Sequence, residues 1–311
     1  MRKLAKIALV VIAALVLLAG GAAVIARSSS RLHRTPFSAP KSSATTWEQV
    51  FRNPQAISVE SFETGRVDAL RSQILDLTNG RTQGLTDGKV TLPVLAHLVH
   101  HERLGNYLVD AGLDKSWTLD RYGTMKGVLA RKALAGATQV AGTDIAALLG
   151  QRTLSLKGVF FTHLHFDHIA GARDLPGNLA YVTGKDDPYQ NYRWLFHGDQ
   201  LNHITELREI DSSNAPALAP FEHAVDVFGD SSLWAVSTPG HSQGHVSFLV
   251  NGRGGPVFLA GDAALDREGF DRNVGSGTFA ADRGRAQKTL ETIIAFSRQF
   301  PSVRVILGHA L

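Results

Sequence analysis

The stretch F-F-T-H-L-H-F-D-H-I-A-G, residues 160–171, places His163, His165, Asp167 and His168 within six positions. Three imidazoles and a carboxylate are not expected together in a hydrophobic core. Neutral imidazoles and carboxylates are the ligands that zinc, iron and manganese bind in proteins. In an H-x-H-x-D-H loop, His163 and His165 can face one metal ion while the other two residues face a second ion roughly 3.5–4 Å away. The stretch therefore predicts part of a two-metal site that other segments must complete.

Three further segments end in a residue that could complete this site. His241 follows L-W-A-V-S-T-P-G, Asp262 follows P-V-F-L-A-G, and His309 follows V-R-V-I-L-G. Because sites in α/β folds gather at the carboxyl ends of strands, we expect these segments to meet the first one at one edge. His241 would complete the first metal and His309 the second, while the two oxygens of Asp262 could bridge them.

A site of this kind generates a nucleophile without a side-chain base. Two divalent cations that share a water lower its pKa from 15.7 toward ~7, so a bridging hydroxide forms near neutral pH. Zinc is the metal we expect, and iron or manganese would suit the same ligands. His245, four residues beyond His241, is expected to pack beside the ligands and support them rather than to bind an ion.

The elements that position these residues are predicted from apolar runs that alternate with helical patterns. Helices are expected over residues 143–150 and 282–300, the second with Asp282 as its N-cap. Residues 184–232 mix aromatic residues, proline and charge, and we expect a helix and a long loop there. Interleaved strands and helices indicate an α/β architecture. Strands are predicted over residues 92–99, 106–110, 158–162, 179–183, 233–238, 245–250, 256–260 and 303–307.

The beginning of the chain differs in composition from the rest. Basic residues precede an uncharged apolar run over residues 7–26, which is long enough for a helix to cross a bilayer. We expect residues 1–26 to be an anchor in inner-membrane lipid, or else a cleaved signal. The catalytic domain would then lie outside the cytoplasm, on the periplasmic or extracellular face. Residues 27–46, rich in Ser, Thr and Pro, are expected to be a flexible linker to a folded domain over 47–311.

The excess of basic residues belongs to this beginning of the chain. Seven of the 32 lysine and arginine residues precede the first acidic residue, Glu48, which leaves 25 basic against 28 acidic residues in the remainder. A nucleic-acid-binding domain would show the reverse, with a basic surface on its folded part. The charge pattern argues against nucleic acid as a partner. The substrate that we expect for the predicted metal site is a small molecule.

Taken in order, T-H-L-H-F-D-H-I-A-G, T-P-G-H-S-Q-G-H, L-A-G-D and L-G-H resemble the successive motifs of the metallo-β-lactamase fold hydrolases. The resemblance covers about residues 50–311 and implies an αββα four-layer sandwich with a dinuclear metal site at one edge. It implies that Asp110, in L-V-D-A-G, orients the ligand loop without binding a metal itself, and that Asp167 can pass a proton to the leaving group. The ligands that it implies are His163, His165 and His241 for the first metal and Asp167, His168 and His309 for the second, with Asp262 bridging.

Residues 226–265 and the upstream L-P-V-L-A-H-L-V look most like the N-acyl-homoserine lactonase-like branch, so a lactone is the expected substrate. Lactonases of that type commonly carry a Tyr three residues after the bridging Asp, where this chain has Leu265. Alternatives within the fold are a thioester hydrolase similar to glyoxalase II, a β-lactamase and a phosphodiesterase. Alternatives of another class are a mononuclear iron dioxygenase and a non-catalytic metal-binding relative. The full ligand set argues against both, and metal content separates them from a hydrolase.

Overall fold

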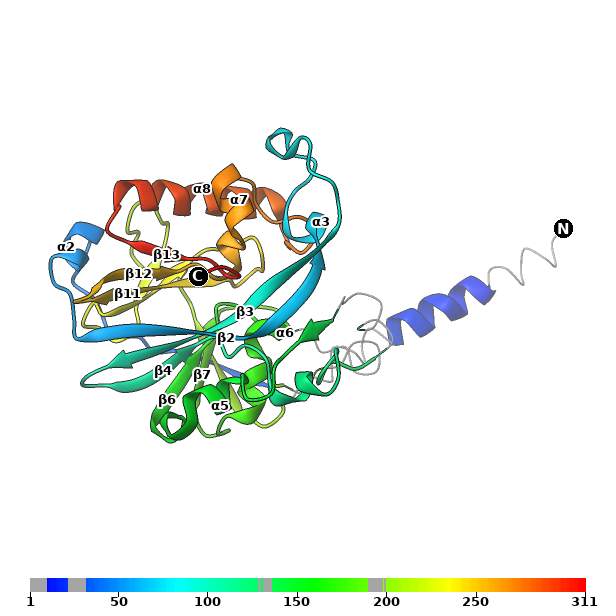
Figure 1. The fold of residues 1–311 in the computed structure, drawn as a ribbon, viewed down its shortest axis with the longest axis horizontal. Coiled ribbons are helices and arrows are strands. Elements are labelled where there is room, and N and C mark those ends of the chain that lie inside the picture. Colours follow the sequence, from blue (N-terminus) through cyan, green and yellow to red (C-terminus); the bar gives the residue numbers. More distant parts are fainter. Residues whose placement is uncertain (1–9, 22–31, 128–129, 131–135, 190–197, 199) are drawn as a thin grey trace.

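A computed structural model describes residues 10–21, 32–127, 130, 136–189, 198 and 200–311. Two β-sheets pack face to face, and helices cover their outer faces (Figure 1). Apolar side chains from both sheets, among them Val99, Phe160 and Phe248, form the core between them. The αββα sandwich that the resemblance implies is confirmed.

The larger sheet has eight strands and supplies the first stretch of candidate ligands. Five neighbouring strands of this sheet run parallel, and the other three pair antiparallel beside them. In spatial order the strands are β1 (His33–Pro36), β8 (Glu206–Ile210), β7 (Ala180–Gly184), β6 (Leu156–Phe160), β4 (Gly105–Val109), β3 (Lys89–His101), β2 (Ile57–Leu70) and β5 (Ala137–Thr138).

The smaller sheet has five strands and supplies the remaining candidates. It is antiparallel except at one edge, where its last two strands in chain order pair in parallel. Its spatial order is β13 (Arg304–Ile306), β12 (Gly255–Leu259), β11 (Val246–Gly252), β10 (Leu233–Ser237) and β9 (Ala224–Asp226).

Helices cover the outer face of each sheet. The α-helices are α2 (Trp47–Phe51), α3 (Arg71–Ile74), α5 (Ile145–Leu149), α6 (Phe166–Ile169), α7 (Arg267–Arg272) and α8 (Arg283–Gln299). The 3-10 helices are η1 (Gly80–Thr82), η2 (Lys115–Thr118), η3 (Gly150–Ser155), η4 (Ala170–Asp174) and η5 (Gly261–Ala264). Residues of α5 and α6 pack on the larger sheet, and those of α2 and α8 pack on the smaller one.

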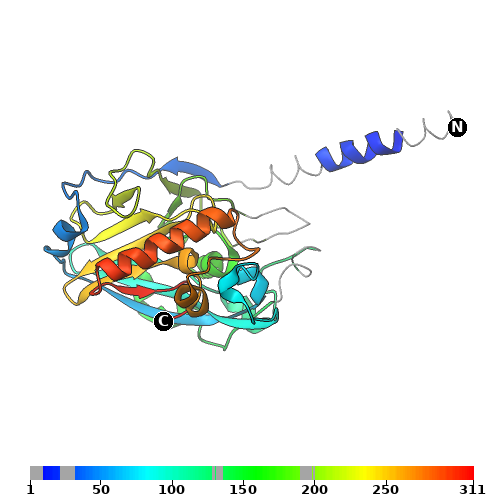
Figure 2. The same cartoon turned by 90° about the horizontal axis from the view of Figure 1, so that it is seen from above.

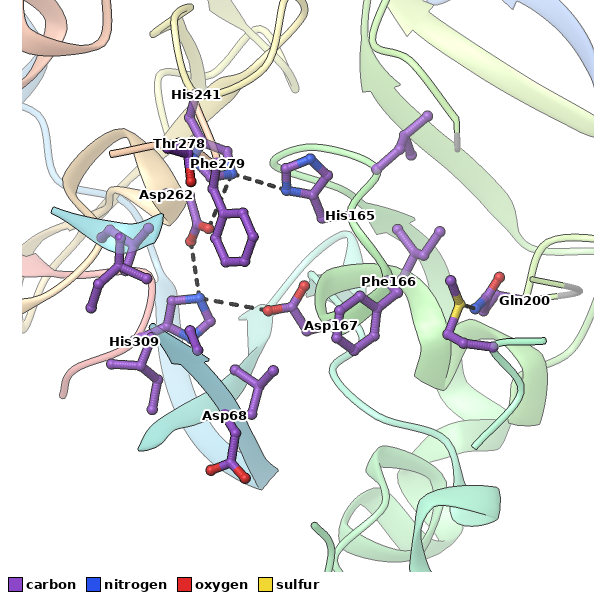
Figure 3. A pocket seen from close by; sticks show the side chains of 18 of the residues that line it. Asp68, His165, Phe166, Asp167, Gln200, His241, Asp262, Thr278, Phe279 and His309 are labelled. Carbon is purple, nitrogen blue, oxygen red and sulfur yellow. Dashed lines mark hydrogen bonds and ion pairs between the residues drawn. The ribbon is translucent and has the colours of Figure 1, made fainter. Parts of the chain in front are cut away.

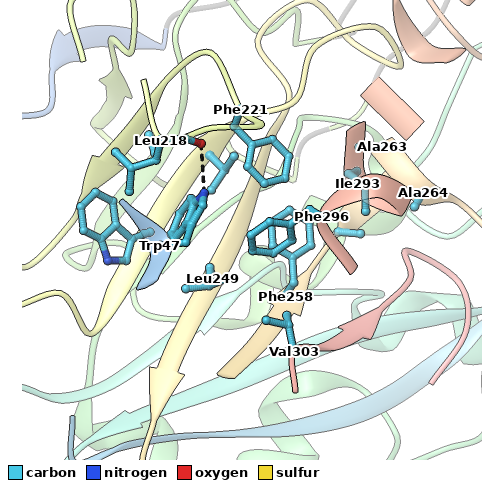
Figure 4. Packing of buried hydrophobic residues seen from close by; sticks show 14 of the residues in the cluster. Trp47, Leu218, Phe221, Leu249, Phe258, Ala263, Ala264, Ile293, Phe296 and Val303 are labelled. Carbon is cyan, nitrogen blue, oxygen red and sulfur yellow. Dashed lines mark hydrogen bonds between the residues drawn. The ribbon is translucent and has the colours of Figure 1, made fainter. Parts of the chain in front are cut away.

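The long helix α8 lies across the smaller sheet (Figure 2). As predicted, Asp282 caps it, because its carboxylate accepts the N–H of Arg285 at 2.9 Å. The buried face packs Phe296 against Trp47 and Phe258 (Figure 4). Trp47 also donates its indole N–H to the carbonyl of Leu218 at 3.0 Å, so its one polar atom is satisfied inside the core.

All eight predicted strands and both predicted helices are present, with ends that differ by a few residues. The expectation of a helix and a long loop over residues 184–232 needs a correction, because β8 and β9 lie there and both join sheets. In the sequence E-L-R-E-I of β8 the two buried apolar residues, Leu207 and Ile210, are three positions apart, so it lacks the two-residue period of a strand. Residues 190–197 and 199, within the same range, lie outside the described part of the chain.

The expected linker over residues 27–46 needs a correction. Its residues 33–36 form β1, which pairs in parallel with β8 at the edge of the larger sheet. Arg34 forms an ion pair with Glu209 at 2.6 Å, and the hydroxyl of Thr35 donates to Glu206 at 2.8 Å. The fold therefore extends back to at least residue 33 rather than beginning at residue 47.

The predicted membrane segment is described only in part. Residues 10–21 form an exposed helix, and residues 1–9 and 22–26 lie outside the described part of the chain. Among the residues that the structure describes, no helix combines the length and the apolar character that a membrane span requires.

Candidate metal centre

The structure brings all seven predicted ligands together in two neighbouring groups. Figure 3 shows the side chains that face one another from both groups, among them His165, Asp262 and His309. The first ligand group consists of His163, His165, His241 and Asp262, and the second consists of Asp167, His168 and His309. Within each group the potential ligand atoms lie within 4.8 Å of one another.

Asp262 joins the two groups. Its Oδ2 atom lies 3.2 Å from Nε2 of His241 in the first group. Its Oδ1 atom lies 3.3 Å from Nε2 of His168 and 3.4 Å from Nε2 of His309 in the second group. One carboxylate thus presents an oxygen to each group, which is the arrangement expected of a bridging ligand.

Strand ends place these residues, as the sequence predicts. His163 follows β6, His241 follows β10, Asp262 lies in η5 directly after β12, and His309 follows β13. Gly308 is required beside Asp262, because a Cβ atom at that position would collide with the Oδ1 atom. The sheets fix the backbone, and the turns after them direct the side chains inward.

Unsatisfied polar atoms test whether these residues suit a metal. His163 Nε2, His168 Nε2 and Asp262 Oδ1 are buried, and none of them has a hydrogen-bond partner. Leaving such atoms without a partner in the interior costs free energy, which a cation bound between them would offset. The donor set of imidazoles and carboxylates is also the one that zinc, iron and manganese accept. The residues therefore fit a pair of divalent cations.

Hydrogen bonds to the second ring nitrogen orient several of these imidazoles. His168 donates its Nδ1–H to Asp110 Oδ2 at 2.8 Å, and His309 donates its Nδ1–H to the carbonyl of Pro93 at 2.7 Å. Asp110 also accepts the N–H and hydroxyl of Thr162, whose oxygen lies 3.1 Å from His163 Nδ1. In each ring the proton on Nδ1 leaves the Nε2 lone pair free for a metal.

His245 lies beside the ligands but belongs to neither group. Its ring centroid is 5.2 Å from that of His163 and 6.2 Å from that of His241. Its Nδ1 atom lies 2.9 Å from the hydroxyl of Thr238, and that hydroxyl lies 2.9 Å from Ser247. This position agrees with a supporting rather than a ligating residue, although its role stays a prediction.

The electrostatics separate the two groups. Burial lowers the pKa of His163 and of His241 well below 6.5. Burial acts in the same direction on His168 and His309, but carboxylates outweigh it and raise the pKa of both, chiefly Asp110 for His168 and Asp262 for His309. The carboxylates that raise these two pKa values carry negative charge, which bound cations would neutralise in place of protons on the imidazoles.

The ligands open into a cavity of about 250 Å³. Its walls are mostly apolar, and Phe166, stacked on Trp117 at 5.3 Å, is one of them. Leu265 lines it too, and the buried amide of Gln200 is a polar exception (Figure 3). Gln200 and the half-exposed Phe279 were not predicted, because a lone polar or aromatic residue in a loop carries no sequence signal.

Comparisons with known proteins bear on the family and the fold of this chain. The family model of the metallo-beta-lactamase superfamily matches residues 90–309. N-acyl homoserine lactonase AttM of Azorhizobium caulinodans is 26% identical over 233 residues, covering 70% of this chain and 82% of its own. Gamma-lactamase MBL2 of Gibberella moniliformis is 32% identical over 136 residues, which cover 39% of this chain. The chain spans 56% of that relative and 33% of gamma-lactamase FDB1 of Fusarium pseudograminearum.

Solved structures share the fold. A quorum-quenching N-acyl homoserine lactone hydrolase superposes with a TM-score of 0.63 at 18% identity, covering 83% of this chain and 94% of its own. AidC, described as a dizinc quorum-quenching lactonase, superposes with a TM-score of 0.54 at 15% identity, covering 89% and 91%.

Proposed function

The chain belongs to the metallo-beta-lactamase superfamily of metal-dependent hydrolases, and from that premise we propose that it hydrolyses a lactone at a centre of two divalent cations. The observation that carries the proposal is Asp262, whose two oxygens face the two ligand groups. A similar curated relative is an N-acyl homoserine lactonase, and similar solved structures are lactone hydrolases by name. These likenesses favour a cyclic ester over the thioester, β-lactam and phosphodiester alternatives.

The first and second ligand groups would hold one cation each, with zinc as the proposed metal. When bound, the two cations would supply hydroxide near neutral pH and polarise the carbonyl oxygen of the substrate. Asp110 and the Pro93 carbonyl keep the Nε2 atoms of His168 and His309 free to bind. The apolar cavity walls exclude water and accept the apolar part of the substrate.

Asp167 is the residue that we propose to move a proton. Its carboxylate lines the cavity, and its Oδ2 atom lies 3.6 Å from His309 Nε2. A carboxyl group in that position can protonate the alkoxide that leaves when the ring opens. Leu265 lines the same cavity without a hydroxyl, so it cannot donate a hydrogen bond to the substrate carbonyl. The proposed reaction therefore depends on the metal centre for that interaction.

Elemental analysis and a substrate panel on one preparation test the proposal. The panel contains acyl-homoserine lactones, a γ-lactam, a thioester, a cephalosporin and a phosphodiester. We expect two metals per chain and lactone turnover that a chelator abolishes. Turnover of another panel member alone would replace the substrate class, and one iron per chain with oxygen uptake would replace the reaction. Leu265→Tyr refines the test, because an increase in lactone turnover would show that the missing phenol limits this chain.

We also propose that the apolar run over residues 7–26 tethers the chain to a membrane, with the metal centre on the periplasmic or extracellular face. The uncharged sequence of that run supports the proposal. Fractionation of cells that express the full chain tests it: protein that stays in the membrane pellet after an alkaline wash is the expected result. Protein found entirely in the soluble fraction with an intact N-terminus would contradict it.

A further inference from the structure

Asp187 is a buried carboxylate that binds no predicted ligand side chain and follows strand β7. Asp187 is 1% exposed to solvent. Its Oδ2 atom accepts the N–H of Leu164 at 2.7 Å. Its Oδ1 atom accepts the N–H of Gly244 at 3.0 Å and the hydroxyl of Ser242 through a short hydrogen bond. Three donors from two distant segments thus converge on one carboxylate.

These donors lie directly beside the ligands of the first group. Leu164 is the residue between His163 and His165, and Ser242 is the residue after His241. Asp187 therefore ties the two loops that supply all three imidazoles of that group. Imidazole rings from the two loops are in contact, since Nε2 of His241 lies 2.9 Å from Nδ1 of His165.

The two loops come from different sheets, so no β-ladder holds them at a fixed distance. The loop of His163 and His165 leaves β6 in the larger sheet, and the loop of His241 leaves β10 in the smaller one. A single backbone bond from Val246 N–H to the carbonyl of Thr162 (2.9 Å) also crosses between them, next to His163. Asp187 adds three bonds farther along both loops. Ligands must be held to within about 0.5 Å for a metal site to work, which gives such a tie a direct effect on affinity.

The local packing is shaped for this contact. A Cβ atom at position 244 would lie 2.6 Å from the backbone nitrogen of Asp187 and 2.8 Å from its Cβ, so only glycine allows the loop to come this close. Within the described part of the chain, no lysine or arginine forms an ion pair with the Asp187 side chain. Desolvation accordingly raises its pKa, and the three donors partly offset that effect. A buried carboxylate without a cationic partner is retained at a cost, which hydrogen bonds to both loops offset.

We propose that Asp187 is a positioning residue that sets the separation of the two loops of the first ligand group, and so controls metal affinity at that group selectively. The inference rests on the proposed metal centre. It assigns Asp187 no contact with substrate. It predicts that the two groups respond differently to loss of this carboxylate.

Asp187→Asn in the full chain tests the proposal, because the amide keeps the shape but turns one acceptor into a donor facing N–H or O–H groups. Co²⁺ is titrated into metal-free protein, and its visible spectrum reports the geometry of each bound ion. We expect one of the two dissociation constants to rise 10–100-fold with a changed spectrum, and the other to stay within about threefold. His165→Ala and His309→Ala, which each remove a ligand from one group, identify the weakened site.

Asp226→Asn is the matched control. Asp226 has 3% exposure, and its carboxylate accepts the N–H groups of Gly229 and Ser231, both at 2.9 Å, in the hairpin between β9 and β10. No ligand lies in that hairpin, so we expect a lower unfolding midpoint of the metal-free protein and two unchanged dissociation constants.

Three outcomes would overturn the inference. Asp187→Asn could behave like Asp226→Asn, it could weaken both groups equally, or it could weaken the second group alone. If Asp187→Asn does not fold, Ser242→Ala removes one of the three donors and should weaken the first group several-fold. Failure of the proposed function is separate, since an unaltered chain that binds no metal would contradict the centre itself before Asp187 is tested.

Discussion

The two ligand groups of the proposed metal centre are held in place by different kinds of contact. In the second group each imidazole is held individually, His168 by Asp110 and His309 by the carbonyl of Pro93. In the first group the Nδ1 atom of His241 has no hydrogen-bond partner, and its loop is tied down through Asp187 instead. One group depends on ring orientation and the other on loop separation. Substitutions of equally buried supporting residues should therefore affect the two ligand groups differently.

Loss of Asp262 should affect the two ligand groups alike, because its carboxylate contacts both. Asp262→Ala removes an oxygen from each group, so we expect both metals and about 10³-fold of turnover to be lost together, the equivalent of about 4 kcal/mol. Elemental analysis and lactone turnover on the same sample measure this. A variant that keeps two metals and full turnover would exclude a shared, bridging ligand.

Asp110→Asn should expose the dependence of the second group on ring orientation. The amide cannot accept from His168 and Thr162 as the carboxylate does, so the His168 ring loses its fixed tautomer. We expect a 10–100-fold loss of Co²⁺ affinity at the second group and a smaller loss at the first. A larger loss at the first group would reverse the assignment of the two mechanisms.

Thr162→Val tests the weaker ring contact of the first group. The hydroxyl of Thr162 joins Asp110 Oδ2 to Nδ1 of His163, and valine keeps the shape without it. One hydrogen bond of this kind contributes about 1 kcal/mol, so we expect affinity at the first group to fall about fivefold. The same cobalt titration measures it, and an effect as large as that of Asp110→Asn would show that ring orientation governs both groups.

His97 should have the smallest effect on the centre, although it lies near Asp110. Burial lowers the pKa of its imidazole from 6.5 to about 4, against the opposing charge of Asp110. As the pH falls from 6.5 to 4, His97 binds a proton in the unfolded chain but not in the folded chain, so the free energy of unfolding decreases across that range. His97→Gln should remove up to about 3 kcal/mol of this dependence in metal-free protein, measured by denaturant unfolding at several pH values, and leave metal affinity unchanged.

The ligands were predictable because each one follows a local pattern. An apolar strand, a turn residue and an imidazole or carboxylate stand together in sequence, and the sheets bring four such ends to one edge. Asp110 was available only through resemblance to a family. The Pro93 carbonyl has no side-chain signal at all, and Asp187 in G-K-D-D-P has the composition of an ordinary surface turn. Contacts made by the backbone, or between segments far apart in sequence, are set by the tertiary fold.

The same limit explains the strands that were missed. Strand β2 (Ile57–Leu70) has unevenly spaced apolar residues, and its register shifts between Glu63 and Gly65, so no regular alternation reveals it in the sequence. Strand β1 has four residues and no apolar periodicity, and it is held by a parallel ladder with β8 and by the contacts of its side chains with Glu206 and Glu209. Its stability comes from its partner strand rather than from its own propensity.

The position of β1 has a practical consequence for handling the protein. An unpaired strand at the edge of a sheet recruits strands from other molecules, and short strands that carry charge and proline resist this. Strand β1 covers β8 with the sequence H-R-T-P, so it blunts that edge. A shortened chain that begins at Trp47, where composition alone would place the domain boundary, would uncover β8. We expect such a chain to self-associate and precipitate, while one that retains residues from 32 onward stays monodisperse.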